Sequence, residues 1–274
     1  MMYSDFSVCM SVYKNDLPEF FNNSVKSIIN QTVKPSEIII VVDGPVSDKI
    51  AEIIKELEHQ YNFFRSIWLE NNVGLGNALA IAVDNSGYDL IARMDSDDIA
   101  VPDRFEKQLL CFQKHPEISV AGGAISEFVE KAENVIGIRK CPITDMEIKK
   151  YLKKRCPFNH MTVMFRREHV LNAGNYIDWK FNEDYYLWIR MHLAGYKFCN
   201  LPETLVYVRV GKEMYSRRGG GIYFKSEAKL QKYLFQKSVI NRNQLFLNLF
   251  IRFIVQIIMP NNIRGYVYQR LLRR

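Results

Sequence analysis

The sequence predicts an α/β protein in which a mostly parallel, Rossmann-like sheet is flanked by helices. Residues 38–42 form a continuous apolar run, which is typical of a strand covered on both faces. Runs of this kind alternate with segments of helical periodicity, and that alternation indicates βαβ units. Residues rich in Asp and Gly follow several of the runs, at the strand ends where open α/β sheets bind ligands.

The first third of the chain alternates regularly between the two periodicities. Apolar residues at helical spacing indicate the helices, and Asp43-Gly44-Pro45 is a turn signal after the second strand. We expect strands over 6–12, 38–42, 66–69 and 88–94, with helices over 17–30, 47–61 and 77–85 between them.

The rhythm loosens after Asp98. We expect helices over 102–115, 165–173 and 185–193, strands over 118–128 and 205–210, a flexible loop over 216–221, and helical structure from Ile222 onward. Neither a repeat nor a linker interrupts the chain. We therefore expect one compact domain over 1–221 and a basic, amphipathic helical extension over 222–274.

Charge is unevenly distributed along the chain. The net charge is +7, but the segment from Tyr207 to the end carries 14 Lys and Arg against two Glu, and the remainder is acidic. Such asymmetry points to an anionic partner, which is membrane lipid, a phosphorylated substrate or nucleic acid. The five cysteines are dispersed and the start of the chain lacks a signal-peptide pattern, so we expect reduced thiols, a cytoplasmic protein and no zinc site.

An acidic turn follows the strand expected over 88–94. Asp95, Asp97 and Asp98 lie within four positions, and such close carboxylates repel one another unless a cation holds them. Oxygen ligands suit Mg²⁺ or Mn²⁺, which commonly bridge to substrate phosphates. The alternative is a solvated turn that caps the next helix, since Asp is a good N-cap residue, and we expect this role for Asp98.

Two further strand ends are expected at the same edge of the sheet. Asp43 can accept a hydrogen bond from a base N–H or a ribose hydroxyl. Gly74 and Gly76 open the helix near Asn77, where the backbone can approach a ligand closely and the helix N-terminus favours phosphate.

In these motifs the chain resembles the family 2 glycosyltransferases, an inverting group with the GT-A fold. The resemblance spans roughly residues 6–210, and it is carried in order by Ser11-Val12-Tyr13, Val42-Asp43-Gly44, residues 72–78, residues 93–98 and residues 182–188. It implies a UDP-sugar donor and a bound Mn²⁺ or Mg²⁺.

The resemblance also implies the residues of the donor site. Asp97 would hold the metal at the diphosphate, and Asp95 would contact the metal or the ribose. Arg93 would support the donor sugar or the acidic turn; alternatively it forms a simple ion pair with a neighbouring Asp. The expected donor-binding residues are Ser11, Val12, Tyr13, Asp43, Gly74, Asn77, Arg93, Asp95 and Ser96.

Glu183-Asp184 is a second carboxylate site. Inverting transfer needs a base for the acceptor hydroxyl, and the resemblance makes Asp184 that base, with Glu183 orienting it or the acceptor. The two also suit the N-terminus of the helix over 185–193. We expect His160 and Trp188 to contact the acceptor, although each is as readily a structural residue.

Basic residues of the last quarter suggest two more contacts. By resemblance, Arg217 or Arg218 closes over the donor diphosphate. Residues 245–259 are apolar except on one stripe of a helix that also includes Gln244, and at about 22 Å they are too short to span a bilayer. We expect an in-plane anchor, with a core helix as the alternative. The basic residues expected to meet lipid headgroups are Arg264, Arg270, Arg273 and Arg274.

The resemblance implies a metal-dependent inverting transferase. The chain is similar in size to bacterial O-antigen and capsule transferases, and this similarity implies that it moves glucose or galactose from a UDP-sugar to a lipid-diphosphate-linked GlcNAc or GalNAc. We expect it to act in O-antigen or capsule synthesis on the inner face of the cytoplasmic membrane. A nucleotide-sugar pyrophosphorylase is the alternative; it would need a Gly-rich basic loop where Tyr13-Lys14-Asn15-Asp16 stands. Nucleic-acid binding is disfavoured by the apolar tail helix and the acidic first part.

Overall fold

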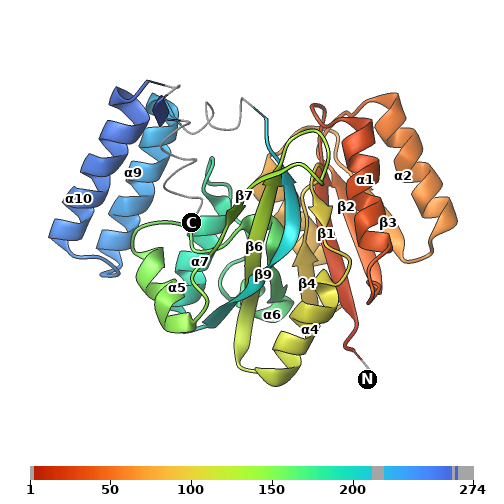
Figure 1. The fold of residues 1–274 in the computed structure, drawn as a ribbon, viewed down its shortest axis with the longest axis horizontal. Coiled ribbons are helices and arrows are strands. Elements are labelled where there is room, and N and C mark those ends of the chain that lie inside the picture. The colour runs from red at the N-terminus through yellow and green to blue at the C-terminus, as the bar shows by residue number, and fades with distance from the viewer. Residues whose placement is uncertain (1–2, 212–218, 261–262, 265–274) are drawn as a thin grey trace.

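A nine-stranded sheet forms the centre of the computed structural model, which describes residues 3–211, 219–260 and 263–264 (Figure 1). Its strands run in the order β3-β2-β1-β4-β8-β6-β9-β5, and β7 pairs with β6. The strands are β1 (Phe6–Val12), β2 (Glu37–Val42), β3 (Phe64–Trp68), β4 (Leu90–Arg93), β5 (Ile99–Ala100), β6 (Ile118–Phe128), β7 (Val135–Arg139), β8 (Met164–Arg166) and β9 (Lys197–Arg209).

Most of these strands share one direction. The pairings make β1, β2, β3, β4, β6 and β9 parallel in direction, while β5, β7 and β8 run the opposite way.

The helices are α1 (Pro18–Ile29), α2 (Asp48–Gln60), α3 (Leu75–Asn85), α4 (Arg104–Lys114), α5 (Asp145–Leu152), the 3₁₀ turn η1 (His160–Thr162), α6 (Arg167–Asn172), α7 (Glu183–Leu193), α9 (Gly221–Gln236), α10 (Arg242–Phe253) and the π-helical turn η2 (Ile254–Ile258). The predicted α/β class is confirmed.

The core consists of two layers because strand residues alternate between the faces of the sheet. Along β2, Ile38 and Ile40 pack with α1, α2 and α4, whereas Ile39 and Val41 pack on the opposite side with α3, α6, α7 and α9. All four side chains are fully buried, which explains the unbroken apolar run in the sequence.

The order of the strands creates a switch point beside β1. The chain moves from β1 outward to β2 and β3, and then returns to place β4 on the other side of β1. Crevices at such switch points lie outside the carboxyl ends of the strands and are the usual ligand sites of open α/β sheets. The acidic turn after β4 and the residues after β1 therefore share one location.

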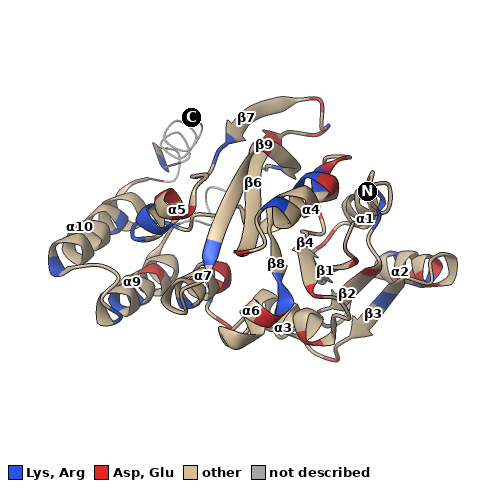
Figure 2. Cartoon of the chain, turned by 90° about the horizontal axis from the view of Figure 1, so that it is seen from below, with Lys and Arg blue, Asp and Glu red and all other residues tan. Residues whose placement is uncertain are grey.

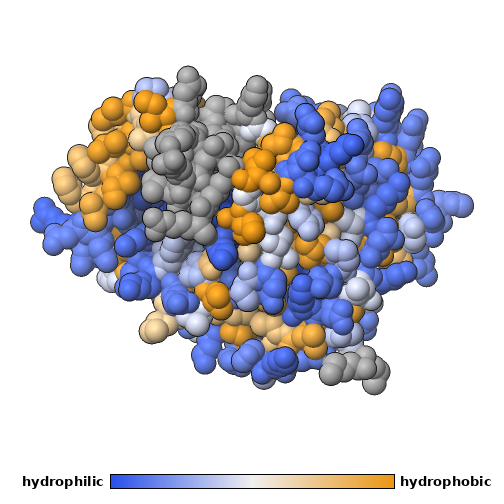
Figure 3. Space-filling view, in the orientation of Figure 1, coloured by the Kyte–Doolittle hydropathy of each residue, from blue (hydrophilic) through white to orange (hydrophobic). Residues whose placement is uncertain are grey.

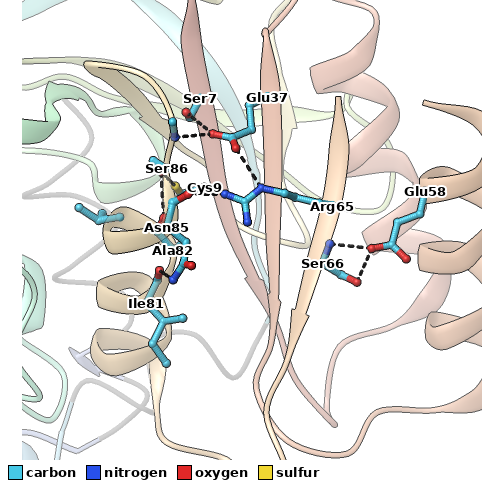
Figure 4. Close-up of polar contacts among 12 residues, drawn as sticks. Ser7, Cys9, Glu37, Glu58, Arg65, Ser66, Ile81, Ala82, Asn85 and Ser86 are labelled. Carbon is cyan, nitrogen blue, oxygen red and sulfur yellow. Dashed lines mark hydrogen bonds and ion pairs between the residues drawn. The ribbon is translucent and has the colours of Figure 1, made fainter. Parts of the chain in front are cut away.

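The opposite edge of the sheet is held together by Glu37 at the start of β2 (Figure 4). Its carboxylate accepts hydrogen bonds from the Ser7 hydroxyl at 2.6 Å, from Arg65 Nε at 2.9 Å and from the Gly87 amide at 2.9 Å. These groups come from β1, β3 and the turn before β4. One side chain thus fixes four neighbouring segments in register below the crevice.

Three features of the chain after Asp98 differ from the prediction. The helix expected over 165–173 begins later, because Met164–Arg166 pairs with β4 and β6 as β8. The strand expected over 205–210 is the end of a longer one, β9. The sequence analysis also missed β5, β7 and α5, which are short elements with weak periodicity.

The C-terminal helices pack on the catalytic body at one end of the molecule (Figure 1). Leu230 and Leu234 of α9 are fully buried in the same core cluster as Trp188. Helix α10 lies outside α9, and its Asn248 donates to Gln231 Oε1 at 2.8 Å. The helical structure expected after Ile222 is therefore present and attached to the body. No helix in the described part of the chain is both long and apolar enough to cross a membrane.

Candidate active site

The acidic turn directly follows β4 at the switch point. Arg93, the last residue of β4, is buried and forms an ion pair with Asp95, so the ion-pair alternative for Arg93 is what the structure shows. The Ser24 hydroxyl of α1 donates to the Asp95 carbonyl at 2.7 Å. These contacts fix the turn from both sides and leave Asp97 exposed at its tip.

Asp16, which the sequence analysis did not single out, joins this turn. Its carboxylate accepts from the Tyr13 amide at 2.9 Å and from Ser96. Burial is the main cause that raises the pKa of Asp16 to about 6, with Asp95 adding to the effect. Desolvation, with the charges of Asp95 and Asp16, likewise raises the pKa of Asp97 to about 6. The one sequence signal for Asp16 is its position in the tight turn after the first strand.

This carboxylate group suits a divalent cation that the substrate helps to bind. The described residues contain no set of three or more His, Cys, Asp or Glu side chains arranged to hold a metal by themselves. Mg²⁺ sites at nucleotides, however, commonly use one or two carboxylates and complete the shell with phosphates and water. Desolvation and the charges of Asp95 and Asp16 raise the pKa of Asp97, and a cation would offset these charges. Asp97, with Asp95 beside it, therefore fits that arrangement.

Asp98 does not cap the following helix, and that expectation is wrong. Helix α4 begins at Arg104, after Asp103. Asp98 is 2 % exposed, and its Oδ1 accepts from the Arg209 amide of β9 at 3.0 Å. The short strand β5 pairs with β9 immediately after Asp98, so the chain runs along the sheet here instead of entering the helix.

Asp43 organises the glycine loop. Its carboxylate accepts from the Asn72 side chain at 2.8 Å, the Val73 amide at 2.6 Å and the Gly74 amide at 3.1 Å. A carboxylate has about four acceptor positions, so one is left for a ligand. Gly44 (φ +81°) lets this turn approach the loop, since a Cβ there would stand 2.7 Å from the Asn72 nitrogen.

The other expected donor-site residues lie at the same edge, with different exposure. Ser11 and Tyr13 are partly exposed at the end of β1. Val12 has a fully buried side chain, and its carbonyl accepts from the Asp43 amide, so it shapes the turn without facing the crevice. Gly74 has open space above its Cα, and the Asn77 side chain closes the first turn of α3 by donating to the Val73 carbonyl at 2.9 Å.

Glu183 and Asp184 begin α7, where the positive end of the helix faces them. Helix α3 approaches this point closely, because a Cβ at Gly76 would lie 3.2 Å from that of Glu183. Burial and the charge of Asp184 raise the pKa of Glu183 to about 7. The Arg93 guanidinium interacts electrostatically with both Asp95 and Asp184. The Arg93 guanidinium is therefore close enough to both predicted carboxylate sites to interact with each of them.

Asp184 is held by two donors. Its Oδ1 accepts from the Tyr185 amide at 2.7 Å, and its Oδ2 lies 3.4 Å from the Cys156 Sγ. Burial raises the pKa of Asp184, while these hydrogen bonds and Arg93 oppose the shift. The pKa of the Cys156 thiol is raised well above its usual range by burial and by Asp184, so the thiol stays protonated and donates. Nothing in the spacing of Cys156 pointed to this contact.

The two residues expected at the acceptor site play different parts. His160 Nε2 and the Tyr176 hydroxyl are 2.9 Å apart, and burial and Arg93 lower the pKa of His160 well below its usual value. The imidazole is therefore neutral and attracts no phosphate by charge. Trp188 has no exposed surface and packs against Phe158, so it supports the centre from below and does not wall an acceptor pocket.

Five of the expected cationic residues cannot be placed. Arg217 and Arg218 lie outside the described residues, as do three of the four basic residues expected at lipid headgroups, Arg270, Arg273 and Arg274. The fourth, Arg264, is 4 % exposed and donates to the carbonyls of Val255, Gln256 and Met259. Its expected headgroup contact is wrong, because its guanidinium is used inside the protein.

Comparisons with known proteins relate the chain to glycosyltransferases. The family model described as glycosyl transferase family 2 matches residues 7–173. A protein of Haemophilus influenzae named an uncharacterized glycosyltransferase is 38% identical over 269 residues, covering 98% of this chain and 99% of its own. An Escherichia coli protein named UDP-Gal:alpha-D-GlcNAc-diphosphoundecaprenol beta-1,3-galactosyltransferase is 34% identical over 269 residues, with 98% and 97% covered.

A solved structure shows that the fold is shared more widely. Staphylococcus aureus TarS 1–349, solved in complex with UDP-GlcNAc, superposes with a TM-score of 0.70 at 14% identity, covering 91% of this chain and 72% of that one. At this identity the likeness concerns the fold alone, and it supports the GT-A architecture.

Proposed function

This chain belongs to glycosyl transferase family 2, and we propose that it transfers a hexose, glucose or galactose, from a UDP-sugar to a lipid-diphosphate-linked GlcNAc or GalNAc. The observation that carries the proposal is the pairing of two carboxylate groups around Arg93. Asp95 and Asp97 suit a donor diphosphate with its cation, and Asp184 suits the base for an incoming hydroxyl.

The proposed donor site uses the residues at the ends of β1, β2 and β4. The remaining acceptor position of Asp43 meets the nucleoside, and the N-terminus of α3 at Gly74 faces phosphate. Asp97, with Asp95 beside it, holds Mn²⁺ or Mg²⁺. A divalent cation bound there neutralises charge that develops on the UDP leaving group.

The proposed transfer is inverting, with Asp184 as the general base. A buried carboxylate with a raised pKa is a stronger base than an exposed one, and its two hydrogen bonds fix its orientation toward the acceptor. Glu183, one residue earlier at the crevice, orients the acceptor. Neutral His160 is paired with Tyr176 and lies close enough to Arg93 for that charge to help lower its pKa.

The acceptor class and setting rest on the relatives. The Escherichia coli protein, covered almost end to end, is named for a diphosphoundecaprenol-linked acceptor. We infer that this chain acts on a similar acceptor in surface-polysaccharide synthesis, on the inner face of the cytoplasmic membrane.

A donor screen tests the proposal. UDP release is measured with UDP-glucose, UDP-galactose and their N-acetyl counterparts, against synthetic GlcNAc- and GalNAc-diphosphate-lipids, with Mn²⁺ or Mg²⁺ present. The expected result is acceptor-dependent UDP release with one UDP-hexose. UDP release that ignores the acceptor would mean hydrolysis of the donor and would contradict the proposed transfer. Formation of a UDP-sugar and diphosphate from UTP and a sugar 1-phosphate would instead support the pyrophosphorylase alternative.

A further inference from the structure

From Leu245 onward, helix α10 and the turn η2 expose most of their apolar side chains and turn their polar ones inward. Asn248 and Gln256 are 6 % and 4 % exposed, and Asn248 donates to the Lys153 carbonyl at 2.9 Å. This arrangement reverses that of an ordinary surface helix, which turns its apolar stripe to the core. The α10 apolar face, visible at one end of the molecule in Figure 3, consists of Phe246, Leu247, Phe250, Ile251, Phe253, Ile257 and Ile258, which are 40–73 % exposed.

The inward polar residues fix this face rigidly to the body. Arg252 donates to Glu227 Oε2 of α9 at 2.6 Å and to the Lys154 carbonyl at 2.8 Å. Both side chains of this ion pair are almost buried, at 12 % and 10 % exposure. The exposed apolar face is therefore the consequence of specific inward contacts and not of a loosely attached helix.

The charges around the face are positive. Helices α10 and η2 contain no acidic residue (Figure 2), and Glu227, the single acid of α9, is neutralised by Arg252. Lys154 and Arg155 are exposed on the turn to which α10 is bonded, and Arg242 is exposed at the start of α10. An apolar face with a basic border is complementary to an anionic lipid surface.

We propose that the α10 apolar face inserts into the interface of an anionic membrane, with α10 lying in the plane of the bilayer. The 17 residues from Arg242 to Ile258 span about 25 Å, less than the ~30 Å hydrocarbon core, so they lie on the membrane without crossing it. A second copy of the chain fits less well, because a symmetric contact would bring two basic borders together. The proposal rests on the lipid-linked acceptor proposed above.

The same helices connect the membrane face to the catalytic turn. Ser226, next to Glu227 on α9, accepts from Asn182 Nδ2 at 3.2 Å and donates to the Lys180 carbonyl at 2.5 Å. Asn182 immediately precedes Glu183 and Asp184. Docking through α10 thus sets the orientation of the catalytic carboxylates relative to the lipid surface, where a diphosphate-linked sugar is presented.

Vesicle co-sedimentation of the full chain tests the proposal, using phosphatidylcholine with about a quarter phosphatidylglycerol. The test variant is Phe246→Gln/Phe250→Gln, since these rings stack on each other at 6.3 Å and both are exposed. The matched control is Leu17→Gln/Trp68→Gln, which removes two exposed apolar residues from the other end of the molecule. We expect a fall of about tenfold or more in vesicle partitioning for the test variant and none for the control.

Two parallel measurements separate the alternatives. Turnover on a water-soluble, short-chain acceptor should be equal in both variants and the wild type, which shows that the site is intact. Unchanged vesicle binding in the test variant would overturn the membrane assignment. The assignment would also be overturned if the wild type does not bind vesicles and light scattering shows a dimer that the test variant dissociates. Vesicle binding as expected without any sugar transfer would refute the proposed function and leave the docking surface standing.

Discussion

The thiol of Cys156 donates to Oδ2 of Asp184 across 3.4 Å. Cys156 lies between α5 and η1, 28 residues before Asp184, so the contact depends on the tertiary fold. A donor to a carboxylate favours its charged form. Cys156 thus limits the rise in the pKa of Asp184 that burial causes.

Replacing Cys156 by Ala should therefore move the acid limb of the kcat–pH profile upward. The base must be unprotonated, and loss of the donor raises its pKa, so activity should disappear at a higher pH than in the wild type. We expect a shift of about half a pH unit. Cys156→Ser keeps a donor and should restore the wild-type limb. Identical limbs in all three proteins would show that the thiol does not tune Asp184.

Removing the charge of Glu183 should stabilise the protein at alkaline pH. Its pKa is raised to about 7 from 4.5, so the folded protein holds a proton that the unfolded chain releases, and stability falls as pH rises through this window. In Glu183→Gln that loss should vanish, with a gain of about 1–3 kcal/mol at pH 8.5 and little at pH 4. Thermal melts at the two pH values provide the test; an equal Tm change at both would contradict the shifted pKa.

Asp97→Ala should weaken metal-dependent UDP binding. The exposed carboxylate at the tip of the acidic turn is the proposed ligand, and its removal leaves Asp95 engaged with Arg93. Calorimetry with Mn²⁺ should show about a tenfold or larger loss of UDP affinity, and chelation of the metal should then have no further effect. Asp103→Ala, which removes an exposed carboxylate outside the turn, is the control. Full UDP affinity and full turnover of the wild type in EDTA would show that neither UDP binding nor transfer needs a metal.

Glu37→Gln should reduce stability without changing catalysis. The carboxylate serves donors from three segments on the edge away from the site, and its hydrogen bonds and Arg65 outweigh burial and lower its pKa. The stabilisation is therefore present above the ordinary Glu pKa and is lost as pH falls through the lowered one. At pH 7 we expect a loss of about 1–3 kcal/mol in the free energy of unfolding, measured in urea, with kcat unchanged. A pH-independent difference would refute the assigned cause.

The sequence predicted the parts of this molecule whose signals are local. The unbroken apolar run of β2 predicts a buried strand of a sheet. Asp43 and Asp95 follow directly where the apolar runs of β2 and β4 stop, so their place at strand ends could be predicted from neighbouring residues. Asp98 was misassigned because its partner, the Arg209 amide, lies 111 residues away, and Trp188 because burial depends on the surrounding helices.

The C-terminal helix shows a different limit. The periodicity of Asn248, Arg252 and Gln256 identified one polar stripe, but a stripe does not state which side faces water. Its direction follows from Glu227 and the carbonyls of Lys153 and Lys154, which accept from Asn248 and Arg252 in the folded chain. Only the structure could assign the apolar side to the surface.

The most direct test of the central claim is the turnover of Asp184→Asn, measured together with its affinity for UDP. The substitution keeps the size of the side chain and removes the base, while the donor site around Asp43 and Asp97 is untouched. If Asp184 is the base, the variant binds UDP with an affinity within about twofold of the wild type and has a kcat lower by about 10²–10⁴. A kcat equal to that of the wild type would contradict the assignment of Asp184 as the base.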